Sequence, residues 1–381
     1  MSKKVTKALI LCALMSLLTG CYPTGELEQP DKPAANNSTT ADGGEISEPA
    51  EFTMPNDLKN VKFNFELGDD YPSEVPVIKA KLRSFDVEKL KAMFIDGKTV
   101  TEETSHEFGG RFTTSDGASL SFGKGRFCYA VDHYYDDEEK HNIYDLQITH
   151  AGNLRVFYQY YQYLDSELEG FPRSEALKRA EELVKKTDLR FFCKPEIYAF
   201  TAEDVENVLP VIVDKEGHET EVHLPKEDEF YLVKYNIEYN GIPIASGHER
   251  IFEDATTASP TLEIIMTKDS LVDFSCYNVF DSIEVVDITQ IKCGAESAMS
   301  NVYDHYKIKD SQITEYKLEY NSFDIEYATY ESDYSSGEFV FKPMWHLSGT
   351  QILTPNGRHY NHVDKFADPV TGYVYEGGRR I

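Results

Sequence analysis

Apolar and polar residues alternate with a period of two along much of this chain, which is the pattern of β-strands with one buried face. The clearest run is YLVKYNIEY at 231–239, and the Asn240-Gly241 pair after it is typical of a tight hairpin turn. Further strands are predicted at EFVFKPMWHL (338–347) and TGYVYE (371–376). One face of the first run carries only apolar and aromatic side chains: Tyr231, Val233, Tyr235, Ile237 and Tyr239.

Two segments show the helical period instead. Ser174 can cap a helix over 174–187, whose apolar face is Ala176, Leu177, Ala180, Leu183 and Val184. A second helix is predicted over 289–307, with the face Ile291, Ala295, Ala298, Met299, Val302 and Tyr306. Strands follow each helix. The pattern therefore predicts an α+β fold with a β-rich N-terminal domain at 56–165 and two helix-plus-antiparallel-sheet modules at 171–284 and 285–381.

The C-terminal tail is predicted to close the second module. In TGYVYE, Tyr373 and Tyr375 share one strand face, and we expect them to meet Trp345 and Tyr316 in a core.

The start of the chain has the pattern of an export signal. A lysine-rich beginning precedes an apolar run from Ala8 to Leu18, which is too short to span a bilayer as a helix. Leu18-Thr19-Gly20-Cys21 then resembles the lipobox of bacterial lipoproteins, in which the cysteine receives a lipid and the leader is cut before it. The resemblance implies a signal peptide at 1–20 and a lipid on Cys21 that anchors the protein to the extracytoplasmic face of the cell membrane. The alternative is an ordinary secretory leader with a chance cysteine.

The composition of the chain limits the classes of partner that it can bind. Residues 21–55 are rich in Pro, Asn, Ser, Thr, Gly and acids, so they predict a flexible acidic tether with a reach on the order of 30 Å. The formal net charge of −28 argues against nucleic-acid binding, which needs clustered Lys and Arg. The 25 Tyr and 22 Phe favour a β-rich body, and the single Trp makes a sugar-binding platform the less attractive explanation of the aromatic content.

Four cysteines lie beyond the leader and the anchor: Cys128, Cys193, Cys276 and Cys293. An exported location permits disulfides, and four cysteines allow three pairings, but buried free thiols are equally consistent with the sequence. If Cys276 and Cys293 pair, the bridge closes a short loop and would stabilise the fold by about 3 kcal/mol.

Several stretches in the C-terminal half resemble a known family. NGIPIASG (240–247), FKPMWHL (341–347) and FADPVTGYVY (366–375) are similar to the strand motifs of PepSY-type modules and YycH/YycI-like regulators, in the same order. The whole chain also resembles lipoproteins common in Firmicutes. Proteins with such modules usually are not enzymes, so the resemblance implies an inhibitor, a chaperone or a partner of another envelope protein.

No motif predicts a metal or a cofactor. HETEVH (218–223) spaces its histidines five apart, where a zinc helix needs four, and the flanks read as a hairpin or loop. GASLSFGKG (117–125) has one residue too many for a phosphate-binding P-loop and lacks the hydroxyl after Lys124. Residues 133–141 collect His, Asp and Glu without the spacing of a calcium loop, and read as an exposed turn.

These observations favour a non-catalytic lipoprotein that binds or regulates another envelope protein. The second hypothesis is a lipoprotein that binds a small ligand, a peptide or a glycan; the third is a cell-surface hydrolase. A flat apolar strand edge would favour the first hypothesis, and a deep aromatic pocket would favour the second.

Overall fold

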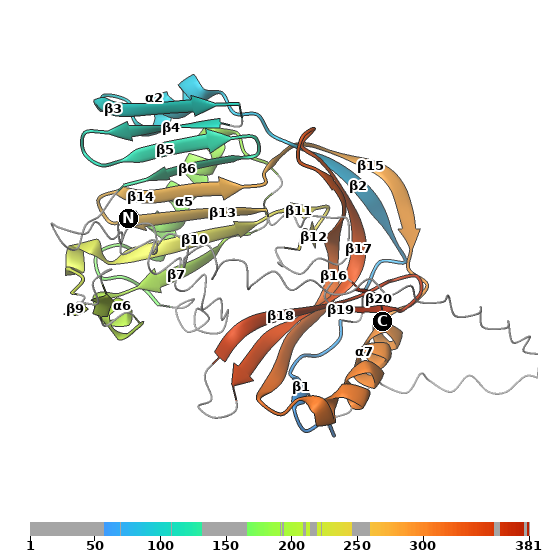
Figure 1. Cartoon of the computed structure of the whole chain (residues 1–381). Helices are drawn as coiled ribbons and strands as arrows, with labels where there is room; N and C mark the ends of the chain where they lie inside the picture. Colours follow the sequence, from blue (N-terminus) through green and yellow to red (C-terminus); the bar gives the residue numbers. More distant parts are fainter. Residues whose placement is uncertain are drawn as a thin grey trace, which may run out of the picture. The chain divides into compact units, whose positions relative to one another are not determined.

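Antiparallel strands form most of the structure (Figure 1). The computed structural model describes residues 57–68, 70–107, 109–131, 166–190, 192, 194–208, 211–213, 219–221, 223–245, 260–353, 359–376 and 379–380. All of them belong to one unit, Phe52–Ile381. Four α-helices lie within these ranges: α2 (Val87–Phe94), α5 (Arg173–Thr187), α6 (Ala202–Val208) and α7 (Ala295–Lys309). Short 3₁₀ turns cover Lys226–Asp228 and Asp310–Gln312.

Sheet 1 has eight antiparallel strands in the order β3-β4-β5-β6-β14-β13-β10-β7. These strands are β3 (Val100–His106), β4 (Gly109–Thr114), β5 (Ser119–Gly123), β6 (Arg126–Ala130), β14 (Leu271–Tyr277), β13 (Thr261–Thr267), β10 (Phe230–Asn236) and β7 (Glu196–Phe200).

Sheet 2 also has eight strands, and its centre is a long hairpin of β16 (Tyr316–Asp333) and β17 (Glu338–Leu353). The other edge of β17 pairs with β2 (Glu74–Leu82) over 338–341 and with β18 (His359–Ala367) over 345–352. The remaining strands are β1 (Val61–Phe63), parallel to β16; β15 (Phe280–Gln290), beside β2; β19 (Val374–Glu376), beside β18; and β20 (Arg379–Arg380), beside β19. Two small hairpins form two-stranded sheets of their own: β8–β9 (Val211–Val213, Glu219–Glu221) and β11–β12 (Glu238–Tyr239, Ile242–Pro243).

One face of sheet 1 is a continuous core. A cross-strand row runs through seven neighbouring strands, and all its members are at most 6% exposed: Phe112, Leu120, Tyr129, Phe274, Ile264, Val233 and Ile197. Helices α2 and α5 cover this face, with Phe94 of α2 packing its ring on Phe127, Tyr129 and Phe274. The next row along the strands is polar and lies on the opposite face: Thr104, Arg111, Ser121, Cys128, Ser275, Glu263, Lys234 and Glu196. The polar side chains of sheet 1 are therefore collected on one face.

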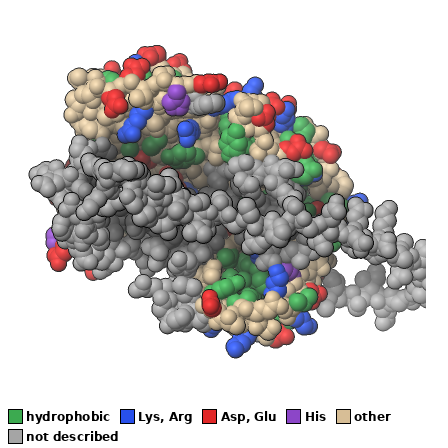
Figure 2. Space-filling view, in the orientation of Figure 1, with side chains coloured by type: hydrophobic (Ala, Val, Ile, Leu, Met, Phe, Trp, Pro, Cys, Tyr) green, Lys and Arg blue, Asp and Glu red, His purple; other side chains and the backbone are tan. Residues whose placement is uncertain are grey.

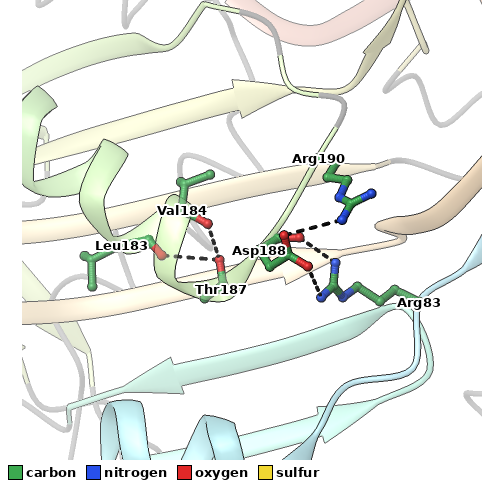
Figure 3. A network of polar contacts seen from close by, with 6 residues as sticks. All are labelled: Arg83, Leu183, Val184, Thr187, Asp188 and Arg190. Carbon is green, nitrogen blue, oxygen red and sulfur yellow. Dashed lines mark hydrogen bonds and ion pairs between the residues drawn. The ribbon is translucent and has the colours of Figure 1, made fainter.

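The C-terminus of α5 is tied to the end of β2 (Figure 3). Asp188 adopts a left-handed conformation as the helix C-cap, and Arg83 donates to its carbonyl oxygen at 2.6 Å and to its carboxylate at 3.4 Å. Attraction from Arg190, together with the hydrogen bond from Arg83, lowers the pKa of the Asp188 carboxyl. Arg83 therefore links a segment that leaves sheet 2 to a helix that covers sheet 1.

The two predicted helix-plus-sheet modules are not found, so this fold prediction was wrong. The strands that follow α5 pair with strands of the predicted N-terminal domain, since β14 lies beside β6 in one sheet. The strands that follow α7 share a sheet with β1 and β2, and β15 runs across the predicted boundary at residue 285. The physical reason is that the strand pairs that define the two sheets join segments more than a hundred residues apart. The architecture is β-rich with large antiparallel sheets, and PepSY-like modules are not supported.

Several local predictions are close to the structure. Helix α5 spans 173–187 where 174–187 was predicted, and Asn240-Gly241 turns the β11–β12 hairpin with both residues at positive φ. Helix α7 begins at Ala295, later than the predicted residue 289, because β15 continues to Gln290. No helix among these described segments has the length and apolar character needed to cross a membrane.

Candidate functional site

The edge strand β15 presents apolar side chains to solvent. Val285, Val286 and Ile288 are 50%, 49% and 53% exposed. Within the described ranges β15 pairs only with β2, so its outer edge has no neighbouring strand (Figure 1). An unpaired edge with apolar side chains is a typical place for another chain to add a strand.

Local features of β15 restrain this edge. Register shifts occur between Phe280 and Ser282 and between Val285 and Asp287, and such bulges bend and twist a strand. The Asp287 carboxylate accepts a hydrogen bond from the Ile288 backbone N–H at 2.8 Å. Both features limit unselective pairing of edges, so the strand is exposed but not open to every partner.

The edge is acidic. From 280 to 290 the chain carries Asp281, Glu284 and Asp287 and no Lys or Arg. Lys79 of the neighbouring strand β2 is held chiefly by Glu338, with 2.9 Å between the ammonium nitrogen and the carboxylate oxygen, and is attracted more weakly by Glu284 of β15. The charge along β15 therefore favours a basic partner.

A buried charged triad crosses sheet 2. His346 of β17 places Nδ1 2.9 Å from Glu326 Oε2 of β16, and Nε2 2.7 Å from Asp364 Oδ1 of β18. Phe366 stacks on the imidazole with 4.5 Å between ring centroids. Burial by itself would lower the pKa of His346, but the charges and hydrogen bonds of Glu326 and Asp364 outweigh it and raise the pKa to about 10. His346 is therefore an imidazolium at neutral pH.

This triad is unsuited to catalysis. A histidine that acts as general base needs one ring nitrogen free for the reacting proton, and a metal ligand needs a free lone pair. Both nitrogens of His346 are bonded to carboxylates, and its pKa lies far above neutrality. The arrangement is that of a structural clamp between three strands.

A second polar cluster lies on the polar face of sheet 1. The Cys128 thiol is 3.7 Å from Asp273 Oδ2, and the Ser275 hydroxyl donates to Asp273 Oδ1 at 2.6 Å. A nucleophilic cysteine or serine needs a base that can take its proton, and here both groups share a carboxylate instead of an imidazole. The described residues contain no group of three or more His, Cys, Asp or Glu that could hold a metal ion.

The predicted cysteine sites have different outcomes. Cys21 and Cys193 lie outside the described residues. Cys276 is fully buried in β14 and Cys293 is partly buried, and both are free thiols, so the structure does not contain the bridge between them. Burial raises the pKa of both thiols, which makes each a poor nucleophile.

The three aromatic residues predicted to lie in a core also have different outcomes. Trp345 is fully buried, packs on Phe323 and Tyr71, and is therefore not a surface platform for sugars. Tyr375 is partly buried against a small cluster around Met344 and Phe366. Tyr373 is 43% exposed, contrary to the prediction, because the strand begins only at Val374 and the turn before it faces solvent.

The two stretches that nearly match a P-loop and a zinc helix lie in hairpins. GASLSFGKG contains β5 and the turn at Lys124 and Gly125, and the strand β6 follows it in place of a helix. Of HETEVH, Glu219–Glu221 form strand β9 of the β8–β9 hairpin, and the His223 ring lies 3.5 Å from the Glu206 carboxylate with 74% of its side chain exposed. The acidic segment at 133–141 lies outside the described residues.

Comparison with known proteins gives a fold and no function. The chain matches no family model and no curated protein. A similar solved structure is that of an uncharacterized protein from Eubacterium rectale, with a TM-score of 0.57 and 16% identity over 84% of this chain and 91% of that chain. At this identity the likeness concerns the fold alone.

The β15 edge and the His346 triad were both missed from the sequence. For β15 the segment SIEVVDI was a usable signal. It is rich in β-branched residues, and Ile283 and Val285 would lie on one face of a strand while Val286 and Ile288 would lie on the other. For the triad no local signal exists, because Glu326, His346 and Asp364 come from three different strands.

Proposed function

We propose that this protein is a lipid-anchored, extracytoplasmic binding protein without catalytic activity, and that it docks an extended segment of another envelope protein along β15. The observation that carries the proposal is the outer edge of β15, which pairs with no other strand in the described part of the chain and carries three apolar side chains about half exposed. An incoming strand would pair with the free backbone groups and cover these side chains. The exposed apolar side chains of this edge strand are the feature that favours partner binding over small-ligand binding.

Charge complementarity specifies the partner. The edge carries three carboxylates and no cation, so the incoming segment should alternate apolar residues with Lys or Arg. A second copy of this chain would bring the same carboxylates against the same edge, and each copy carries a net charge of −28. The proposal therefore commits to a basic and apolar strand of a different protein.

The absence of catalysis is proposed from the two polar clusters. His346 has both ring nitrogens occupied, and Cys128 and Ser275 share an acidic partner. The His346 triad contains no nucleophile, and the group hydrogen-bonded to both Cys128 and Ser275 is the Asp273 carboxylate, not an imidazole.

Selection from a displayed library of eight-residue peptides tests the docking proposal, with the whole chain after the predicted signal peptide as the target. We expect selection to enrich peptides that alternate Val, Ile or Phe with Lys or Arg. The double variant Val286→Lys and Ile288→Lys should bind the selected peptides at least tenfold more weakly, because it removes apolar contact and adds repulsion. Both side chains are about half exposed, so the variant should keep its melting temperature.

The matched control is Val100→Lys on β3, which is also an edge strand and is 40% exposed at Val100. This control should bind the peptides as the unmodified protein does. Equal peptide binding by the double variant would place docking elsewhere. Self-association at micromolar concentration that the double variant abolishes would make the occupant a second copy. Either result overturns the proposal.

The anchor is tested separately. We expect Cys21→Ala to move the protein from the membrane fraction to the soluble fraction, because the proposed lipid is attached to that thiol. Immunoblots of fractionated cells measure this. Unchanged membrane fractionation of Cys21→Ala would rule out lipidation at this residue, and Cys128→Ala serves as the control that keeps the anchor.

A further inference from the structure

A hollow of about 350 Å³ lies on the polar face of sheet 1 at its β3–β6 end. The side chains that give it its character come from five neighbouring strands: Thr104 and His106 of β3, Arg111 of β4, Ser121 of β5, Arg126 of β6 and Tyr277 of β14. Figure 2 shows a histidine and basic side chains together at the upper left, where Figure 1 places these strands. This volume suits a small organic molecule.

The register of the strands explains why the surface is hollowed here. His106, Gly109, Gly123 and Arg126 are direct cross-strand neighbours, so two glycines lie between a histidine and an arginine. Gly109 has φ +147, and a Cβ on it would lie 2.0 Å from the Phe122 carbonyl oxygen. No other residue can therefore fill this position, so β4 and β5 carry no side chain between His106 and Arg126.

The charge of the hollow is opposite to that of the molecule. The chain has 66 Asp and Glu, yet none of the described residues that line the hollow is acidic. Arg83, Arg173, Arg179 and Arg190 each bond to a carboxylate or a carbonyl oxygen. For the side chains of Arg111 and Arg126, by contrast, no hydrogen bond or ion pair is found in the described ranges.

We propose that this hollow is a binding site for a small anionic ligand, held through a carboxylate, phosphate or sulfate group by Arg111 and Arg126. A guanidinium presents paired N–H donors that match the oxygens of such groups. The Thr104 and Ser121 hydroxyls are further donors from the same row of the sheet. Burial, and then the nearby Cys128 and Asp273, raise the pKa of Tyr277 to about 12, so its hydroxyl keeps its proton at neutral pH and can donate.

This site is independent of the docking edge. The hollow is formed by sheet 1, and β15 belongs to sheet 2. Two arginines in a strongly acidic molecule also suit one compact anion better than a polyanion, whose further charges would meet carboxylates.

Isothermal titration calorimetry of the mature full-length chain at low ionic strength tests the proposal with four probes: inorganic phosphate, sulfate, glucuronate and uncharged glucose. We expect binding of at least one anion and none of glucose. The variants Arg111→Gln and Arg126→Gln should each weaken this binding at least tenfold, and the double variant should abolish it. A preference for glucuronate would indicate a carboxylated ligand, and a preference for phosphate or sulfate would indicate a phosphorylated or sulfated one.

Arg190→Gln is the charge-matched control, because Arg190 is exposed and contacts only Asp188 at 3.6 Å in the polar network of Figure 3. It should bind the anion as the unmodified protein does, and circular dichroism should show that all variants are folded. No heat with any of the three anions, or equal affinity in Arg111→Gln and Arg126→Gln, would overturn the assignment. The β15 double variant should keep anion binding, so failure of this site and failure of strand docking can be told apart.

Discussion

Replacing Asp364 with Ala is expected to lower the free energy of unfolding by about 3–5 kcal/mol, the loss typical when one partner of a buried ion pair is removed. Asp364 is 2% exposed and His346 is 7% exposed, so water cannot replace the lost carboxylate. The imidazolium would keep only Glu326, which lies on one side of it. Urea denaturation of the variant and the unmodified protein measures the difference.

Glu326→Gln is the matched control for this prediction. The Glu326 side chain is 22% exposed, and glutamine can still accept a hydrogen bond from His346, so the loss should be clearly smaller. A loss below about 1 kcal/mol for Asp364→Ala would show that the triad contributes little to stability.

The triad also predicts a pH dependence. The folded-state pKa of His346 is raised to about 10, above the value near 6.5 of an unfolded histidine. Its stabilising contribution is therefore complete below about pH 6.5 and is lost as the pH rises through about 10. The difference in unfolding free energy between the unmodified protein and His346→Gln should shrink over this range, which urea titrations at several pH values measure; a constant difference would contradict the account.

Replacing Trp345 with Ala is expected to cost about 3–5 kcal/mol, as large aromatic truncations in a core do. Trp345 is fully buried; its ring stacks on Phe323 with 5.3 Å between centroids and meets the edge of Tyr71 at 4.9 Å. The indole N–H donates to the Cys293 carbonyl oxygen at 2.8 Å, which fixes the segment before α7. The side chain therefore holds together three parts of the chain that are distant in sequence.

Trp345→Phe separates the packing from the hydrogen bond. It keeps an aromatic ring in the core but removes the donor to Cys293 and part of the indole volume, so a smaller loss of about 1–2 kcal/mol is expected. Chemical denaturation of both variants checks the order. If Trp345→Ala and Trp345→Phe lose equal stability, the ring packing is not the main contribution.

The sequence predicts single helices and strands of this protein better than it predicts which strands pair with one another. The face of Tyr231, Val233, Tyr235 and Ile237 is buried as the alternation indicates, and α5 has almost its predicted bounds. Both results depend on residues close in the chain. Cys128 pairs with Ser275, and Ile78 pairs with Val285, across more than a hundred residues of sequence. Alternation along one strand does not indicate which distant strand it pairs with, or in which register.

The same limit applies to the candidate sites. The hollow needs Arg111 on the same face as Ser121 and Arg126, and only the assembled sheet brings these residues together. The charge of each residue was visible in the sequence, but the lack of acidic side chains among the described residues that line the hollow is a property of the fold. A duplicated module was predicted because helix-then-strands occurs twice, and strands from outside each repeat complete both sheets.

The central claim is that β15 docks a basic and apolar strand of another envelope protein. The most direct measurement places a photo-crosslinking amino acid at Val286 in intact cells, with the same amino acid at Val100 as control, and identifies the crosslinked peptides by mass spectrometry. The account predicts an adduct from Val286 alone, whose peptide comes from a different protein and alternates apolar residues with Lys or Arg. No adduct at Val286, equal adducts at both positions, or an adduct formed by a second copy of this chain would contradict it.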